Sequence, residues 1–158
     1  SNSTPCLGLD MPYKQPVSVL VVIHTPALRV LLLERAAHPG YWQSVTGSQE
    51  AGESLLDTAC REVREETGID IPPARLLDWR LSQTYEIFPE WRHRYAPGVT
   101  HNREHVFSLE VPTETAIRLA PSEHRAYLWL DLAEAARRCF SWSNRDAILD
   151  LPRRLGRA

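Results

Sequence analysis

The sequence of 158 residues lacks several features that would assign it to common classes of protein. It has no run of apolar residues long enough to span a bilayer, and its start lacks the basic and then apolar layout of a secretory signal. The formal net charge is only -2, which argues against a nucleic-acid coat or an anionic membrane surface as the partner. A phosphate-bearing small molecule stays possible, because local charge can differ from the total.

Cysteine is scarce as well. Cys6, Cys60 and Cys139 are odd in number and share no metal-binding spacing, which favours reduced thiols and a cytoplasmic location. Ser1 and Asn2, without a methionine, are interpreted as the remnant of a cleaved expression tag. No internal repeat and no shift in composition marks a second domain. A chain of this length that is 43% hydrophobic is therefore predicted to form one domain with a substantial core.

The most informative stretch is GSQEAGESLLDTACREVREETGI, residues 47–69. Gly47, Glu53 and the run that starts at Arg61 place charged residues or glycine at seven fixed positions. At roughly one in twenty per position, such a match arises by chance about once in 10^9 starting points. We therefore interpret the stretch as a functional motif.

Within this stretch the sequence predicts a helix. Ser54 followed by Asp57 is typical of a helix start, with a serine cap and a carboxylate three residues on. Gly68 can adopt the left-handed conformation that ends a helix. One face at helical spacing is expected to pack on the core. It comprises Leu56, Ala59, Cys60, Val63 and Thr67.

Glu62, Glu65 and Glu66 lie three and four residues apart, so a helix brings their carboxylates onto one neighbouring face. Like charges at this spacing repel each other unless a cation neutralises them. A hard divalent cation with oxygen ligands, magnesium or manganese, would do so. The alternative, a solvated charged face, is favoured only for an isolated run of this kind. Arg61 is interpreted as a brace, because its planar fork can fix the rotamer of a carboxylate.

The rest of the chain alternates between strands and helices. Strands are predicted at Val17–His24, Arg29–Glu34, Trp42–Thr46, Leu76–Thr84, Glu104–Val111 and Tyr127–Leu130. One further helix is predicted at Asp131–Cys139 with Asp131 as its cap, and a last helix is predicted to start with Ser143 as its cap. The segment Pro89–His101 is expected to be an irregular loop that is functional or mobile. Interleaved strands and helices predict an α/β (α+β) fold with a mixed sheet between helices.

Some single residues are assigned to the core. His24 lies on a buried strand and is interpreted as a core histidine. Trp42, Trp129 and Trp142 are expected in the core as well.

The motif at residues 47–69 resembles the Nudix box, the signature of hydrolases that cleave a nucleoside diphosphate linked to another moiety, and nothing departs from its pattern. The resemblance implies a Nudix-type α/β/α sandwich with a mixed β-sheet over residues 13–150. Residues 1–12 would be an irregular lead-in, and residues 151–158 a C-terminal tail. It also implies a bound Mg2+ or Mn2+ ion, with the carbonyl of Gly47 among the ligands.

Five more segments are similar to a narrower group of bacterial Nudix enzymes that act in folate biosynthesis. They are YKQPVS at 13–18, YWQSVTGS at 41–48, HRYAPGVT at 93–100, EHRAYLWLD at 123–131 and SWSNRDAI at 141–148. The resemblance implies hydrolysis of 7,8-dihydroneopterin triphosphate to the monophosphate and pyrophosphate. The alternatives are a pyrophosphohydrolase of canonical or oxidised nucleoside triphosphates and a non-catalytic Nudix-fold binding module.

The same resemblance implies roles for the acidic residues. Glu62 and Glu66 would be the principal metal ligands, with Glu65 as a helper and Arg61 as their brace in the catalytic group. Glu123 would be a further metal ligand or the base that deprotonates water. The alternative for Glu123 is a surface acid that precedes a strand.

The resemblance further implies a substrate-binding set. Lys14, Arg35 and Thr46 would contact the triphosphate or the pterin, although Arg35 could equally be a solvated charge at a strand end. The substrate pocket would be lined by Tyr85, Glu86, Ile87, Phe88 and Ser141. The loop at residues 93–95 combines cations that suit phosphates with a ring that could stack on a pterin; alternatively, it closes one end of the sheet. The expected partner is a small-molecule triphosphate, without nucleic acid or membrane, bound by a monomer or small homo-oligomer.

Overall fold

The computed structural model of the chain describes residues 13–157. The expected lead-in at residues 1–12, with the tag remnant and Cys6, lies outside the described residues. Cys60 and Cys139 are free thiols. No helix among the described residues is long and apolar enough to cross a membrane.

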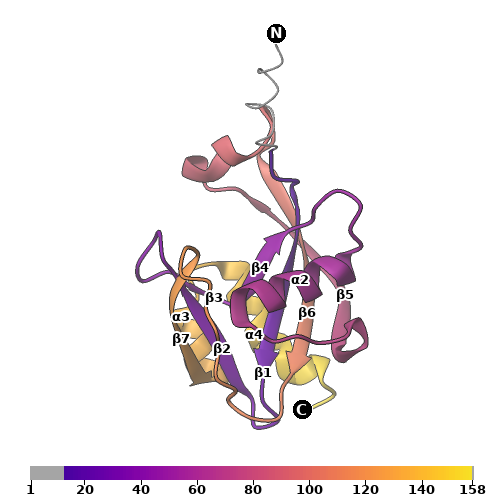
Figure 1. Ribbon diagram of the computed structural model, residues 1–158, viewed down its shortest axis with the longest axis vertical. Coiled ribbons are helices and arrows are strands. Elements are labelled where there is room, and N and C mark those ends of the chain that lie inside the picture. Colours follow the sequence, from indigo (N-terminus) through magenta and orange to yellow (C-terminus); the bar gives the residue numbers. More distant parts are fainter. Residues whose placement is uncertain (1–12, 158) are drawn as a thin grey trace.

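A seven-stranded mixed sheet organises the fold (Figure 1). Its strands are β1 (Val17–His24), β2 (Arg29–Arg35), β3 (Trp42–Gln43), β4 (Val45–Ser48), β5 (Leu76–Glu86), β6 (His101–Glu110) and β7 (His124–Asp131). The order is β3-β2-β1-β6-β5, with β4 paired to β1 and β7 paired to β2. Only β1 and β6 are parallel, and all other pairs are antiparallel. The central strand β1 is almost entirely buried, as its continuous apolar sequence predicts.

Strand β1 changes its neighbour along its length. Near its start, Ser18 to Val21 pair with β4, whereas near its end His24 pairs with Val30 of β2. The half of the sheet formed by β2 and β7 therefore diverges from β4 at the end where Arg35 and His124 pair. The candidate site lies at this divergence.

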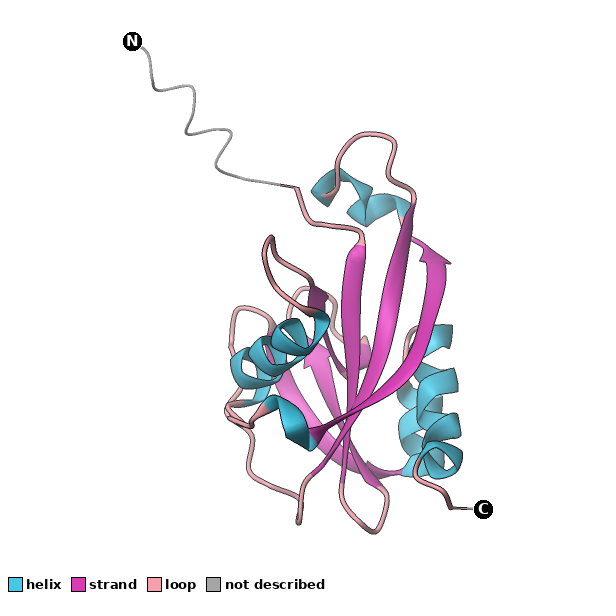
Figure 2. Cartoon of the chain, turned by 90° about the vertical axis from the view of Figure 1, so that its right-hand side faces the viewer, coloured by secondary structure: helices cyan, strands magenta, loops and turns pink. Residues whose placement is uncertain are grey.

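Helices cover both faces of the sheet (Figure 2). The helix α2 (Leu55–Thr67) packs on one face, and α3 (Leu132–Arg138) and α4 (Trp142–Arg154) pack on the other. The first core cluster includes Val19, Val21, Ile23, Leu33, Ala59 and Val63. The second includes Leu20, Val22, Val106, Ala135, Ala147 and Ile148. Alternate side chains of β1 thus pack into opposite core clusters, because successive strand side chains point to opposite faces of the sheet. The predicted α/β/α sandwich is confirmed.

The ends of α2 follow the prediction. The Ser54 side chain accepts a hydrogen bond from the Asp57 amide at 3.1 Å, and Gly68 ends the helix with a φ of 79°. The predicted apolar face was wrong at Leu56, which is 37% exposed, because the neighbouring Leu55 packs on the core instead. Glu62 takes part in the buried face, which turns the acidic side of the helix toward the sheet.

The start of α4 differs from the prediction. The cap is Ser141, whose hydroxyl accepts from the Asn144 amide at 3.3 Å, rather than Ser143. Ser143 is buried inside the helix, and Trp142 is 47% exposed rather than in the core. The inward position belongs to Asn144, whose side chain bonds to the amide and hydroxyl of Ser44 at 2.8 and 3.0 Å. The helix continues to Arg154, so residues 151–154 of the expected tail are helical.

Other boundaries also shift. Strands β6 and β7 begin three residues earlier than predicted, at His101 and His124. The expected loop that starts at Pro89 begins with a 3-10 helix, η2 (Pro89–Arg94). Another 3-10 helix, η1 (Pro73–Arg75), precedes β5. Asp131 occupies the cap position of α3 without a capping bond, because its carboxylate binds Arg29 at 2.8 Å. His24 is 1% exposed, as expected for a core histidine.

The face of the sheet beneath α4 contains one buried carboxyl group. Glu104 of β6 is 4% exposed, and burial raises its pKa to about 7 despite a hydrogen bond from Ser143. The folded state therefore holds this proton at pH values where the unfolded chain has released it. The contribution of Glu104 to stability is complete below pH 4.5 and is lost as the pH rises to about 7.

We expect Glu104→Gln to remove this pH dependence. Relative to the wild type, the variant should gain roughly 3 kcal/mol of unfolding free energy between pH 4.5 and pH 8. Thermal unfolding at a series of pH values measures the gain as a Tm difference that grows by about 5–10 °C. Glu90→Gln at an exposed position is the matched control. Parallel Tm profiles for Glu104→Gln and the wild type would contradict the prediction.

Candidate active site

The centre of the site is a pair of buried carboxylates on α2. Glu62 and Glu66 are 8% and 2% exposed and lie one turn apart on the side of the helix that faces β4. Burial is the main cause that raises the pKa of both groups. A hydrogen bond between the two carboxyl groups raises the pKa of Glu66 and lowers that of Glu62.

Gly47 makes this burial possible. A Cβ atom at this position would lie 1.9 Å from Oε2 of Glu62 and 2.0 Å from its carboxyl carbon, which is far inside van der Waals contact. Any side chain at residue 47 would therefore displace the Glu62 carboxylate. The glycine at the start of the motif is thus required by the close approach of the helix to β4.

Arg61 ties the loop and the helix together. Its guanidinium donates to Glu53 at 2.6 and 3.0 Å, to Glu62 at 3.1 Å and to Glu65 at 3.3 Å. A further bond of 3.1 Å reaches the carbonyl of Ser48 in β4. This partnership lowers the pKa of Glu53 to about 2 and raises that of Arg61. The geometry is that of a brace, as the sequence predicted.

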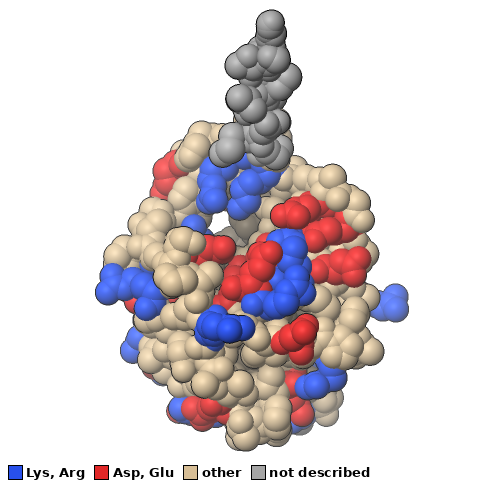
Figure 3. Space-filling view, in the orientation of Figure 1, with Lys and Arg blue, Asp and Glu red and all other residues tan. Residues whose placement is uncertain are grey.

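Three cations face these carboxylates. The amide of Lys14 donates to the carbonyl of Arg94 at 2.9 Å, which joins the start of the described chain to the segment after β5. Burial and the nearby charge of Arg94 lower the pKa of Lys14 and of Arg35. Figure 3 shows basic side chains along one edge of a hollow and acidic side chains along the other. A negatively charged ligand between the cations would relieve their repulsion.

Arg35 is held in place rather than free in solvent. Its Nη1 donates to Gln43 at 3.3 Å, and its guanidinium lies 4.7 Å from the ring centroid of Trp91. The amide nitrogen of Gln43 lies 3.2 Å from Nε2 of His124. Burial and the charge of Arg35 lower the pKa of His124 to about 4, so this histidine is neutral near pH 7. The Nε atom of Arg35 is buried and has no hydrogen-bond partner within the described part of the chain, so it could donate to a ligand.

Glu123 lies in the turn that precedes β7. Its backbone carbonyl accepts from the Ala36 amide at 2.9 Å, and its side chain is exposed. Its negative charge raises the pKa of Glu62 and of Glu66. Glu123 therefore lies within electrostatic range of the carboxylates of α2.

An aromatic group stands next to Arg35. It consists of His38, Tyr41, Phe88, Trp91 and Phe140, with neighbouring ring centroids 4.8–6.2 Å apart. Sequence reasoning singled out only Phe88 of these rings. Of the other four, His38 and Tyr41 share the connection between β2 and β3, and Trp91 and Phe140 come from two further segments. The aromatic character of the loop that contains Trp91 was the one signal in the sequence.

The remaining predicted substrate residues are engaged in contacts of their own. The hydroxyl of Thr46 donates to the carbonyl of Val19 at 2.9 Å, and the hydroxyl of Ser141 caps α4. Glu86 forms an ion pair with Arg92, and Ile87 is 3% exposed. The hydroxyl of Tyr85 accepts from Asn102 at 3.0 Å on the α4 face of the sheet.

The donor set around Glu66 fits a hard cation. Its Oε1 is buried without a hydrogen-bond partner among residues 13–157. The Glu62 carboxyl group lies beside Glu66, and the backbone of Gly47 lies beside Glu62. All these donors are oxygen atoms, the ligands that Mg2+ and Mn2+ prefer. Within residues 13–157 no three acidic, histidine or cysteine side chains are already arranged around an ion position. Glu123 or Glu65 would therefore have to approach to complete a third carboxylate ligand.

Comparison with known proteins places this geometry in a family. The model of the NUDIX domain matches residues 14–151. The chain is 50% identical to the dihydroneopterin triphosphate diphosphatase of Escherichia coli strain K12 over 142 residues, which cover 88% of this chain and 93% of that protein. It is 43% identical to the enzyme of the same name from Haemophilus influenzae over 143 residues, 89% of each protein.

A solved structure agrees with the sequence relatives. The structure of the Escherichia coli dihydroneopterin triphosphate pyrophosphohydrolase superposes with a TM-score of 0.81 at 50% sequence identity. The match covers 86% of this chain and 94% of that one.

Gly47→Ala tests the close approach of α2 to β4. The new methyl group must push the Glu62 carboxylate away, while the flexible end of that side chain can move without unfolding the protein. We expect kcat to fall by about 10^2-fold or more, as for the loss of one preorganised charged group, with Tm within a few degrees of the wild type. Turnover and thermal unfolding measure the two effects, with Ala51→Ser in the same exposed loop as the control. Normal turnover by Gly47→Ala would mean that the position of Glu62 does not matter for activity.

Proposed function

The chain belongs to the NUDIX domain family, and we propose that it hydrolyses 7,8-dihydroneopterin triphosphate to the monophosphate and pyrophosphate, a step of folate biosynthesis. The observation that carries the proposal is the pair of opposed charge clusters at the site. Buried carboxylates on α2 face the cations Lys14, Arg35 and Arg94, whose positive charges repel one another. The 50% identity to the Escherichia coli diphosphatase over most of both chains supports the pterin substrate.

The cations would hold the triphosphate. Lys14, Arg35 and Arg94 come from three different segments and converge on the carboxylate side of the site. The unpartnered Nε of Arg35 can donate to a phosphate oxygen, and a planar guanidinium suits two such bonds. Gln43 and the neutral His124 fix the orientation of Arg35.

Glu62, Glu66 and the carbonyl of Gly47 would hold a divalent cation, with Glu123 as a possible further ligand. Magnesium is the proposed ion and manganese the alternative. When bound, such an ion would offset phosphate charge and lower the pKa of a bound water. Arg61 keeps the Glu62 carboxylate in place through its bonds to Glu53 and β4.

Proton transfer is assigned to Glu123. Its exposed carboxylate lies near enough to Glu62 and Glu66 to act on their pKa values, and it forms no hydrogen bond or ion pair with another side chain of residues 13–157. A general base must lie within about 3 Å of the attacking water, directly or through one further water. Glu65 is the alternative base, although it is already engaged by Arg61 at 3.3 Å.

The aromatic group supplies a place for a flat heterocycle. Tyr41 and Phe140 are stacked at 4.8 Å, and Phe88 and Trp91 are stacked at 5.1 Å. Such rings can stack on a pterin, and Arg35 over Trp91 connects them to the phosphate end. A cytoplasmic location, the absence of a nucleic-acid partner and a monomer or small homo-oligomer remain predictions.

A panel of substrates tests the proposal. We expect kcat/KM for 7,8-dihydroneopterin triphosphate to exceed the values for GTP, ATP and 8-oxo-dGTP by at least about tenfold, with pyrophosphate as a product. A higher value for a nucleotide would assign the chain to nucleoside triphosphate hydrolysis. Pyrophosphate release from none of them in the presence of magnesium would indicate a binding module instead.

The metal prediction has a readout apart from activity. Chelation should abolish turnover, and magnesium should restore it and raise Tm, since a ligand that binds only the folded state stabilises it. Glu66→Gln keeps the shape of the side chain but removes its charge, so we expect the magnesium-dependent rise in Tm to shrink and kcat to fall by about 10^2-fold. Glu90→Gln is the control. Full turnover in excess chelator would refute the metal requirement.

Glu123→Gln separates catalysis from stability. Because the side chain is exposed, the substitution should change the unfolding free energy by no more than about 0.5 kcal/mol. We expect kcat to fall by about 10^2-fold, within the range for loss of a general base. Steady-state turnover assays measure kcat, and thermal unfolding measures the change in unfolding free energy. A Glu123→Gln variant that turns over normally would transfer the role of base to Glu65.

A further inference from the structure

A row of polar side chains crosses the face of the sheet beneath α4. Ser48 pairs with Ser18 across β4 and β1, Ser18 pairs with Glu104 across β1 and β6, and Glu104 pairs with Gln83 across β6 and β5. Directly paired residues share a face of a sheet. Three strand spacings of about 4.8 Å separate the ends of the row, roughly 14 Å in all.

Asn102 and Tyr85 form a second pair beside this row. Asn102 is 1% exposed, and its amide nitrogen donates to the hydroxyls of Ser18 at 2.8 Å and Tyr85 at 3.0 Å. Two rows of polar groups thus occupy a region where the rest of the same face is apolar. Buried polar groups are costly unless they find partners.

Three oxygen atoms in these rows have no hydrogen-bond partner among the residues that the structure describes. They are Oε1 of Glu104, Oε1 of Gln83 and Oδ1 of Asn102, and all three are buried. Each of the three oxygen atoms is a hydrogen-bond acceptor, so the two rows contain more acceptors than donors to satisfy them. Unsatisfied buried groups are rare in native proteins and indicate a missing ligand or water.

The rows connect with both ends of the proposed substrate site. Ser48 directly follows Gly47, whose backbone lies against the Glu62 carboxylate. On the other side, two short segments connect the rows with the aromatic group: residues 85–88 run from Tyr85 to Phe88, and residues 140–143 run from Phe140 to Ser143, which bonds to Glu104. The rings of Phe88 and Phe140 lie 6.2 Å apart.

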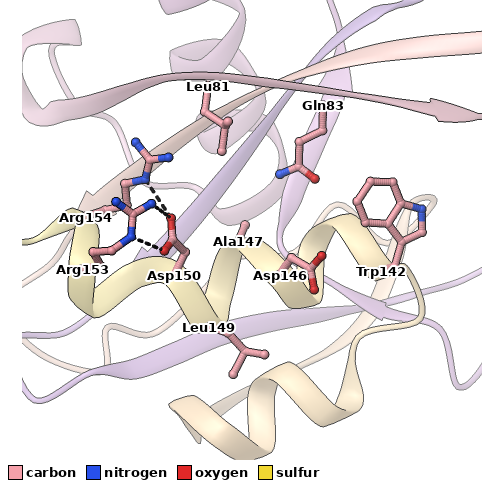
Figure 4. Close-up of a pocket in the computed structure, with 9 residues that line it drawn as sticks. All are labelled: Leu81, Gln83, Trp142, Asp146, Ala147, Leu149, Asp150, Arg153 and Arg154. Carbon is pink, nitrogen blue, oxygen red and sulfur yellow. Dashed lines mark hydrogen bonds and ion pairs between the residues drawn. The ribbon is translucent and has the colours of Figure 1, made fainter. Parts of the chain in front are cut away.

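Gln83 also borders open space. It points into a groove of about 540 Å³ between β5 and α4, together with Trp142 and Asp146 (Figure 4). The far end of the row is therefore next to a groove, and the near end is next to the carboxylate site.

We propose that Glu104, with Gln83 and Asn102, determines specificity by accepting hydrogen bonds from the donor edge of a 2-amino-4-oxopyrimidine ring. This inference rests on the proposed function and deepens it. The ring N–H and the exocyclic amino group of such a ring are adjacent donors, and they match adjacent acceptor oxygens as a guanidinium matches a carboxylate. Pterin and guanine carry this edge, whereas adenine has no ring N–H at the corresponding position.

The tests are kcat/KM for 7,8-dihydroneopterin triphosphate, GTP and ATP, and the inhibition constant of pyrophosphate. For Glu104→Gln we expect kcat/KM for the pterin substrate to fall by about 10^2-fold, because the new amide group opposes a substrate donor and leaves it unpaired. The loss should appear in KM, with kcat within a few-fold. The effect on GTP should be similar, whereas ATP and the inhibition constant of pyrophosphate should not change.

Two further variants complete the set. Gln83→Met removes one acceptor at a half-buried position and should reduce kcat/KM for the pterin substrate by about 5- to 10-fold. This variant tests the specificity proposal if Glu104→Gln does not fold. Glu110→Gln makes the same chemical change at an exposed position of the same strand and should behave as the wild type.

Several outcomes would overturn the inference. Unchanged KM in both Glu104→Gln and Gln83→Met would mean that the free oxygens bind water or one another. Equal losses for all substrates and for pyrophosphate would mean that Glu104 only supports the fold. If the wild type does not hydrolyse the pterin substrate, the proposed function is wrong, but the role of Glu104 can still be tested with nucleotides. In that case, a wild-type preference for ATP over GTP would overturn the role proposed for Glu104.

Discussion

The whole site depends on the burial of two like-charged groups, Glu62 and Glu66, against the backbone of β4. Burial disfavours the ionised carboxylates and so raises their pKa, which makes the pair a local cost to stability. Only the absence of a side chain at Gly47 lets Glu62 come this close. A bound cation is the component that would turn this repulsion into attraction, because both groups could then be ionised at once.

The two charge clusters of the site are built differently. The acidic cluster comes from one helix and is held by Arg61, which contacts the preceding loop, the helix and β4. The basic cluster is assembled from Lys14, Arg35 and Arg94, and within residues 13–157 Arg35 is the one of the three whose side chain forms a hydrogen bond. A well-fixed metal end combined with a less constrained phosphate end suits a polyphosphate, whose charge must be held while one of its bonds is broken.

Much of this could be anticipated from local sequence. The limits of α2 follow from the cap at Ser54 and the glycine at residue 68, because both act within one turn of the helix. The carboxylates three and four residues apart had to share a side of that helix. That they would be buried, and Leu56 exposed, depended on how the helix is rotated over β4. Nothing in the local pattern specifies that rotation.

Other features were beyond sequence reasoning because they depend on contacts between distant segments. Ser141 and Ser143 both precede residues that suit a helix, and the choice between them depends on Asn144 reaching Ser44, 100 residues away. Trp142 is exposed for the same reason. The aromatic group and the row at Glu104 each combine residues from three or more segments. No residue spacing within a single segment predicts either cluster.

The pleat of β4 links chemistry to recognition. Gly47 and Ser48 are consecutive, yet they belong to opposite faces of the sheet, because strand side chains alternate. Gly47 pairs with Val19, which packs beneath α2, and Ser48 pairs with Ser18, which lies beneath α4. A single peptide unit therefore joins the face that carries the carboxylates to the face that carries the free acceptor oxygens. A slip of one residue in the pairing of β4 with β1 would exchange the two faces, so the register that buries the core also fixes the distance between the metal ligands and the pocket for the heterocycle.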